Sequence, residues 1–296
     1  MYEPYFGFAE KPFSLTPDPK YLYRSESHAN AFELLQYALD RREGFVVITG
    51  DIGTGKTTLC RALLEQTDRK TFTALLLNPF LSEEDLLKAI LQDLGVVSRN
   101  EDAWGGRQPS KQDLINTLYD FLLSLIPLGA RAVLIIDEAQ NLPLPILEQI
   151  RILSNLETDK EKLLQIILVG QLNLIPLLRS PELRQLDQRI SVRYQLTPLS
   201  EEEVAAYVAH RLTIAGPSRA VTFAPDALAR VHEYSGGIPR LINLICDRAL
   251  LNAYSAQTSR IEVDLVDAAA DGLDLKPAPV PQRSSWFGRF RRSGSR

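Results

Sequence analysis

Residues 50–58 have the composition and spacing of a phosphate-binding loop. Gly50, Gly55, Lys56 and Thr57 satisfy the pattern G-x-x-x-x-G-K-[ST], between a buried strand predicted at 45–49 and a helix predicted to run through 64. Glycines allow successive backbone N–H groups to surround phosphate oxygens, and the helix adds its positive N-terminal end. We expect Lys56 to reach the β- and γ-phosphates and the Thr57 hydroxyl to bind Mg²⁺. The predicted nucleotide contacts in this loop are Gly50, Asp51, Ile52, Gly53, Thr54, Gly55, Lys56, Thr57 and Thr58.

Two adjacent acids, Asp137 and Glu138, follow a strongly apolar run at 132–136. Asp137 at the end of a strand is expected to hold the Mg²⁺ ion and its water shell together with Thr57, and Glu138 to polarise the attacking water as general base. Adjacent acids after a strand also occur at an ordinary solvated helix start. The phosphate-binding loop earlier in the chain favours the catalytic interpretation.

Four further polar residues have positions that suit a nucleotide site. Gln171 ends another apolar run, so its amide either orients the attacking water or is an ordinary turn residue. Arg184 and Arg189 precede the last predicted strand and are either surface salt-bridge residues or an arginine finger for a neighbouring subunit, with Arg189 preferred. Arg240 begins a predicted helix after Gly236–Pro239 in the sequence, and we expect it to reach the γ-phosphate when a lid closes.

The order of apolar runs predicts an α/β fold. The runs at 45–49, 71–77, 132–136 and 164–169 lack polar alternation, which is typical of a parallel sheet covered on both faces, and a last strand is expected to end at 195–197. After Pro198 the periodicity is purely helical. We therefore predict four segments: an aromatic and proline-rich irregular arm at 1–23 that packs its rings on a neighbouring surface, a nucleotide-binding core at 24–197, a helical lid at 198–272 and a basic, disordered tail at 273–296.

Composition restricts the other function classes. The 296 residues carry a net charge of −4, but the segment from 276 onward holds six basic and no acidic residues, which leaves −10 on the rest and argues against broad coating of DNA. Cys60 and Cys246 are not spaced as a disulfide framework or a zinc site and are expected to be inert core thiols. His28, His210 and His232 are not spaced as metal ligands. For His28, contact with adenine and a capping or packing role both stay open. With no apolar run of spanning length and no signal-peptide pattern, we expect a cytoplasmic protein.

Eight motifs of the chain occur together in one known family: FGF at 6–8, KPF at 11–13, TPDP at 16–19, SESH at 25–28, the phosphate-binding loop, DEAQN at 137–141, LVGQ at 168–171 and GIPR at 237–240. By these motifs the chain resembles the AAA+ ATPases of the ExeA type, which include the general secretion pathway A and MshM-like pilus ATPases. The resemblance covers about residues 1–270, and it implies a P-loop NTPase αβα sandwich with a parallel five-stranded sheet, a helical lid, ATP at their interface and homo-oligomeric ring assembly. It also implies that Gln171 is sensor 1 and Arg240 is sensor 2. Longer secretion-type members continue into a transmembrane helix and a peptidoglycan-binding domain, whereas the basic tail here is compatible with a short pilus-type or exosortase-associated form.

These features give one leading function and two alternatives. The leading hypothesis is a Mg²⁺-dependent ATPase whose cycle moves the lid and supports assembly of a type II secretion, pilus or exosortase-type envelope system. The first alternative is a DNA-bound ATP switch similar to transposition or replication helpers. The second is a regulatory protein that hardly hydrolyses ATP, and the presence of Glu138 argues against it.

The tail, with Trp286, Phe287 and Phe290 among arginines, is either a solubilising segment, a contact to nucleic acid or a peripheral contact to the inner membrane. The loop at 99–110 is a candidate partner-contacting segment.

Overall fold

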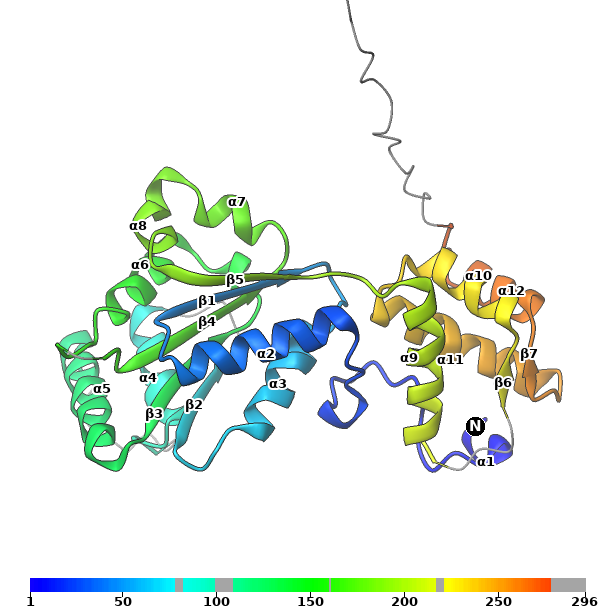
Figure 1. Ribbon diagram of the computed structural model, residues 1–296, viewed down its shortest axis with the longest axis horizontal. Helices are drawn as coiled ribbons and strands as arrows, with labels where there is room; N and C mark the ends of the chain where they lie inside the picture. The colour runs from blue at the N-terminus through cyan, green and yellow to red at the C-terminus, as the bar shows by residue number, and fades with distance from the viewer. Residues whose placement is uncertain (78–81, 99–108, 160, 217–220, 278–296) are drawn as a thin grey trace, which may run out of the picture.

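The computed structural model describes residues 1–77, 82–98, 109–159, 161–216 and 221–277. Residues 99–108 of the candidate partner-contacting loop and residues 278–296 of the basic tail lie outside this part of the chain. Within it, the chain forms two bodies joined by the segment after the last core strand (Figure 1). We call the larger body, built around a five-stranded sheet, the core, and the smaller one, built from the last four helices, the lid.

The core sheet is parallel throughout, as the apolar runs predict. Its strand order is β2-β3-β4-β1-β5, so the first and third strands of the chain are separated by the fourth. Every residue of β1 is buried, whereas β5 at the sheet edge alternates between exposed and half-buried positions before it ends. The strands are β1 Phe45–Gly50, β2 Thr71–Leu76, β3 Arg131–Ile136, β4 Leu164–Gly170 and β5 Ile190–Leu196.

Helices cover both faces of this sheet, which confirms the predicted αβα sandwich. Because strand side chains alternate, Val46 and Ile48 pack under α2 and α3 on one face, while Phe45 and Val47 contribute to the core on the opposite face with α4, α5 and α6 (Figure 1). The core helices are α2 Glu26–Asp40, α3 Lys56–Gln66, α4 Glu83–Asp93, α5 Lys111–Leu125, α6 Leu144–Leu153, α7 Leu174–Leu178 and α8 Arg184–Asp187, with short 3₁₀ turns at η1 Pro19–Tyr21, η3 Ile126–Leu128, η4 Ala139–Asn141 and η5 Pro181–Leu183.

The lid has its own hydrophobic core. Ser200 begins it with a capping box, in which its hydroxyl accepts from the Glu203 N–H and the Glu203 carboxylate accepts from the Ser200 N–H. The sequence predicts helices alone here. The structure adds two parallel two-residue strands, β6 Thr222–Phe223 and β7 Arg260–Ile261, which are too short to leave a periodic pattern. The lid helices are α9 Glu201–Ile214, α10 Pro225–Ser235, α11 Pro239–Ser255 and α12 Val263–Asp271.

The first residues of the chain, expected to be irregular, contain α1 Glu3–Phe6 and the η1 turn, and their rings pack into the lid. Phe6 and Phe13 are buried in the lid core. Arg211 of α9, itself 5% exposed, donates from Nε to the Pro12 carbonyl (2.6 Å) and from its terminal nitrogen to the Ser14 carbonyl (2.9 Å). On the core side, Arg61 of α3 donates to the Pro17 carbonyl at 3.1 Å. The arm therefore joins the lid to the core.

Candidate nucleotide-binding site

The phosphate-binding loop connects the buried β1 to α3, and its backbone requires glycine at two positions. Gly53 and Gly55 have φ values of 84° and 94°, a region that side-chain-bearing residues avoid. A Cβ on Gly53 would lie 2.5 Å from the Arg240 Cβ, and one on Gly55 would lie 3.1 Å from Nε2 of His28. The loop is thus closely packed against the lid on one side and α2 on the other, with the N-terminus of α3 facing its concave side.

Lys56 is the first residue of α3 and is 5% exposed. Its ammonium donates to the carbonyls of Gly50 (3.0 Å) and Asp51 (2.8 Å), so the charge lies inside the loop. Burial lowers the pKa of Lys56, and the nearby carboxylates of Glu138 and Asp137 oppose that effect. A buried ammonium at the N-terminus of a helix is an arrangement that attracts anions.

Thr57 and Asp137 bring two parts of the sheet together. The Thr57 hydroxyl donates to Oδ2 of Asp137, which follows β3 and is 6% exposed. The other carboxylate oxygen of Asp137 accepts from the Glu138 N–H at 2.8 Å. A hydroxyl and a carboxylate in contact are hard oxygen donors that fit Mg²⁺, an ion that keeps several of its waters and takes few protein ligands. No group of three or more His, Cys, Asp or Glu residues in the described ranges is arranged to hold a metal by itself.

Glu138 lies beside this pair and carries a strained backbone. Its φ of 51° and ψ of 37° place it in the left-handed region, where a residue with a side chain is uncommon. Its Oε2 accepts a hydrogen bond from Nε2 of Gln171 at 3.2 Å, so the structure brings Gln171, after β4, to the carboxylate that the sequence assigns as base. Nε2 of Gln140 donates to the same oxygen at 2.6 Å, a contact that the sequence did not suggest.

The lid reaches the loop through the beginning of α11. The backbone N–H of Arg240 donates to the Gly53 carbonyl at 3.2 Å. This approach depends on Gly237, where φ is 76° and a Cβ would lie only 2.0 Å from the Leu199 carbonyl oxygen. Arg240 thus stands at the pocket beside the phosphate-binding loop, where a side chain from the lid would meet a phosphate.

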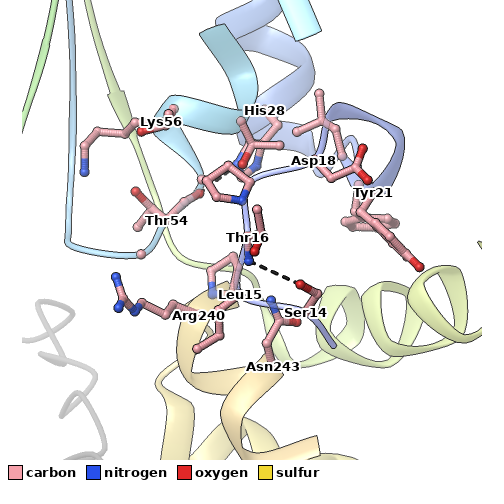
Figure 2. Close-up of a pocket in the computed structure, with 18 of the residues that line it drawn as sticks. Ser14, Leu15, Thr16, Asp18, Tyr21, His28, Thr54, Lys56, Arg240 and Asn243 are labelled. Atoms are coloured by element: carbon pink, nitrogen blue, oxygen red, sulfur yellow. Dashed lines mark hydrogen bonds between the residues drawn. The ribbon is translucent and has the colours of Figure 1, made fainter. Parts of the chain in front are cut away.

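A pocket lies where arm, core and lid meet (Figure 2). Figure 2 shows Lys56 on the loop side, Arg240 and Asn243 of α11 on the opposite side, and Leu15 of the arm between them. The sequence did not predict that the arm and most of these lid residues line the pocket. Neither an aromatic and proline-rich segment nor the periodicity of a helix indicates which cavity the residues face. Further lining residues from these parts are Ser14, Thr16, Pro17, Asp18, Tyr21, Leu22, Tyr23, Leu199, Tyr207 and Arg211.

His28 contacts the phosphate-binding loop. It is 3% exposed, and its Nε2 donates to the Thr54 carbonyl at 2.9 Å. Its other ring nitrogen then accepts from the Ser25 hydroxyl at 2.7 Å, which fixes the neutral tautomer. These contacts are those of a residue that positions the loop, and its ring also lines the pocket.

The two arginines proposed as fingers differ in their surroundings, and neither lines the pocket of its own chain. Arg189, which the sequence favours, is half-buried and donates to the Ser154 hydroxyl and to the Arg151 carbonyl (3.3 Å) at the end of α6. Arg184 is exposed at the start of α8 and makes no ion pair with the described residues. Arg189 is therefore engaged within its own chain, whereas Arg184 is exposed to solvent.

The two cysteines lie in the hydrophobic interior. Cys60 and Cys246 are both buried, and burial raises the pKa of the Cys60 thiol to about 12. Such a thiol stays protonated and is a poor nucleophile.

In the part of the chain that the structure describes, no helix has both the length and the apolar character to cross a bilayer.

Comparison with known proteins gives a family match, a curated relative and a set of similar folds. Residues 39–178 match the AAA domain family. The chain is 49% identical over 261 residues to general secretion pathway protein A of Aeromonas hydrophila, an alignment that covers 88% of this chain and 46% of the relative, so the chain spans about half the length of that protein.

Solved structures with the same fold come from more distant proteins. The Aeropyrum pernix ORC2 protein, in complexes with ADPNP and ADP, is 17% identical with a TM-score of 0.66 over 89% of this chain and 71% of its own. Cdc6p from Pyrobaculum aerophilum is also 17% identical, with a TM-score of 0.69 over 88% and 70%. The Thermotoga maritima RuvB Holliday junction branch migration motor is 20% identical, with a TM-score of 0.55 over 84% and 70%. At these identities the likeness is one of fold.

The burial of His28 predicts that stability falls as the pH falls. Burial lowers the pKa of His28 from its ordinary value of 6.5, so below about pH 6.5 the unfolded chain binds a proton that the folded chain does not. We expect His28→Gln to lose part of this dependence, with a difference in unfolding free energy between about pH 7.5 and pH 5.5 that is smaller than that of the original chain by roughly 1 kcal/mol. Urea unfolding at both pH values measures it. Equal pH dependence in the two proteins would contradict the prediction.

Proposed function

Because the chain belongs to the AAA+ family of P-loop ATPases and is homologous to general secretion pathway protein A, we propose that it binds and hydrolyses ATP with Mg²⁺ and uses the cycle to move its lid. The observation that carries the proposal is the convergence of Lys56, Thr57, Asp137 and Glu138 at one end of a parallel sheet, beside a pocket closed by the lid. Ligands of open α/β sheets bind at this edge, beyond the carboxyl ends of the strands.

The triphosphate is proposed to lie along residues 53–57. The backbone N–H groups at the start of α3 and the Lys56 ammonium would hold its β- and γ-phosphates, and Arg240 would approach from the lid. Thr57 and Asp137 would hold Mg²⁺, which supplies positive charge to the phosphate oxygens. Lys56 would exchange its carbonyl partners in the loop for phosphate oxygens.

Glu138 is proposed as the general base. Its carboxylate would accept a proton from water as the water oxygen attacks the γ-phosphorus, the bond to the β-phosphate oxygen breaks, and ADP and phosphate result. Gln171 contacts that carboxylate and is proposed to orient the attacking water. Loss of the γ-phosphate would then remove the proposed partner of Arg240 and loosen the lid, whose remaining tie to the loop includes the Arg240 N–H contact to Gly53.

Assembly into a homo-oligomeric ring is proposed to complete the site. A guanidinium from a neighbouring subunit would stabilise charge on the transferring phosphoryl group. We place this role at Arg184 rather than Arg189, because Arg189 already donates to Ser154 and Arg151 of its own chain.

The cellular role is proposed from the curated relative. A 49% identity to general secretion pathway protein A favours service to a secretion, pilus or exosortase-type envelope system, on the cytoplasmic side and peripheral to the inner membrane. The DNA-bound alternative has weaker support, because the ORC, Cdc6 and RuvB likenesses are of fold and the body of the chain is acidic. DNA-stimulated turnover that disappears at raised salt would favour that alternative instead.

Two substitutions are expected to separate binding from hydrolysis. Glu138→Gln removes the base but no phosphate contact, so it should keep ATP affinity and lower kcat by about 10²- to 10⁴-fold. Lys56→Ala removes the buried cation and should abolish binding. Calorimetry with ATP and a phosphate-release assay measure the two quantities. Normal turnover by Glu138→Gln would refute the base assignment.

Mixing of variants tests the finger between subunits. Arg184→Ala and Lys56→Ala should each lower activity strongly in the assembled protein. Their mixture should recover a measurable fraction, because an intact pocket of one subunit then meets the intact Arg184 of the other. Arg189→Ala, mixed in the same way, is the control and should show no recovery beyond its own rate. Recovery with Arg189→Ala and none with Arg184→Ala would assign the finger to Arg189.

A further inference from the structure

Gln140 has no role in the site as described so far, yet it contacts the proposed base directly. It lies in the η4 turn, two residues after Glu138. Nε2 of Gln140 donates to Oε2 of Glu138 at 2.6 Å, and Oε1 of Gln140 accepts from the backbone N–H of Gln171 at 3.0 Å. One amide thus joins the base to the end of β4.

The orientation of this amide is determined by its partners. The backbone N–H of Gln171 can only donate and the Glu138 carboxylate can only accept. A flipped amide would therefore face a donor with a donor and an acceptor with an acceptor, losing both hydrogen bonds. Gln140 must present its NH₂ group to Glu138.

Gly170, the last residue of β4, provides the space for Gln140. A Cβ on Gly170 would lie 2.8 Å from Oε1 of Gln140 and 2.8 Å from Cδ2 of Leu174. An amide oxygen and a β-carbon cannot coexist at that separation, so the absence of a side chain here is a condition for the Gln140 contact. This packing is independent of the hydrogen bonds themselves.

Glu138 requires such support because its backbone lies in the left-handed region, which is unfavourable for a residue with a side chain. Its left-handed φ of 51° is held on the main-chain side by the hydrogen bond from its N–H to Asp137. On the side-chain side, Oε2 accepts from Gln140 and from Gln171. Among the described residues no donor reaches Oε1, which leaves that oxygen to accept from water.

We propose that Gln140 is a positioning residue for hydrolysis: with Gln171 it holds Oε2 of Glu138 so that Oε1 faces the attacking water. The inference rests on the proposed ATPase function. Glu138 lines the pocket and Gln140 does not, so Gln140 acts through Glu138 without touching the nucleotide. Its loss should therefore change kcat and leave nucleotide binding unchanged.

The test uses the full chain and three substitutions. Gln140→Met keeps the length of the side chain but removes the donor, Gln140→Glu keeps an acceptor for the Gln171 N–H but turns a carboxylate toward Glu138, and Gly170→Ala displaces an intact Gln140. Each should lower kcat for ATP by about 10-fold or more, less than removal of the base itself, with KM within about 2-fold of the original. Gln112→Met on α5, where the amide donates to the neighbouring Asn116, is the matched control and should keep the original kcat.

A double-substitution cycle separates positioning from a structural effect. In a Glu138→Gln background, Gln140→Met should lower single-turnover hydrolysis by less than about 2-fold, because the base through which it acts is already absent. Thermal unfolding shows whether the variants fold. If Gln140→Met does not fold, the same measurements are made with Gln140→Glu.

Four outcomes would overturn the inference. An unchanged kcat in the folded Gln140 variants overturns it while leaving the proposed ATPase function intact. A full 10-fold effect that persists in the Glu138→Gln background, or a raised KM at normal kcat, also overturns it. If the original chain itself binds ATP without turning it over, the proposed function fails and the positioning role fails with it.

Discussion

The hydrogen bond between the Thr57 hydroxyl and the Asp137 carboxylate is the interaction on which the rest of the site depends. It connects the first turn of α3, which follows β1, to the end of β3, although β4 lies between these two strands. Because β1 and β3 run in the same direction, the ends of both strands lie at one edge of the sheet. β4 runs in the same direction, so Gln171 after β4 lies against Glu138, and parallel pairing brings together the four groups assigned to metal and water.

Closure of the pocket depends on a second constraint, which is the close approach of backbones. Gly53 of the phosphate-binding loop lies against the Arg240 side chain, and Gly237 of the lid lies against the Leu199 carbonyl, so neither glycine has room for a side chain of its own. The arm adds the third wall and is held to the lid by the buried Arg211. The proposed phosphate site is thus next to both the lid and the arm, which gives a physical basis for coupling the proposed hydrolysis to motion of the lid.

The sequence predicts the loop, the two acids and the parallel sheet well, because each is a local pattern: glycine spacing beside an apolar run, or acids directly after one. It does not reveal Gln140, whose partners at Glu138 and Gln171 come together only in the folded sheet. The engagement of Arg189 with α6 and the arm wall of the pocket are likewise tertiary facts. The two-residue strands β6 and β7 leave no periodicity to detect.

A crystal structure of the chain with Mg²⁺ and a non-hydrolysable ATP analogue would show whether this edge of the sheet holds the nucleotide. We expect phosphate density against the backbone nitrogens of 53–57, the Lys56 ammonium in contact with phosphate oxygens, and a metal ion bound by Oγ1 of Thr57 next to Asp137. We also expect Glu138 to face the terminal phosphate. Analogue bound elsewhere, or an ordered triphosphate with Asp137 and Glu138 directed away from it, would refute the proposed site.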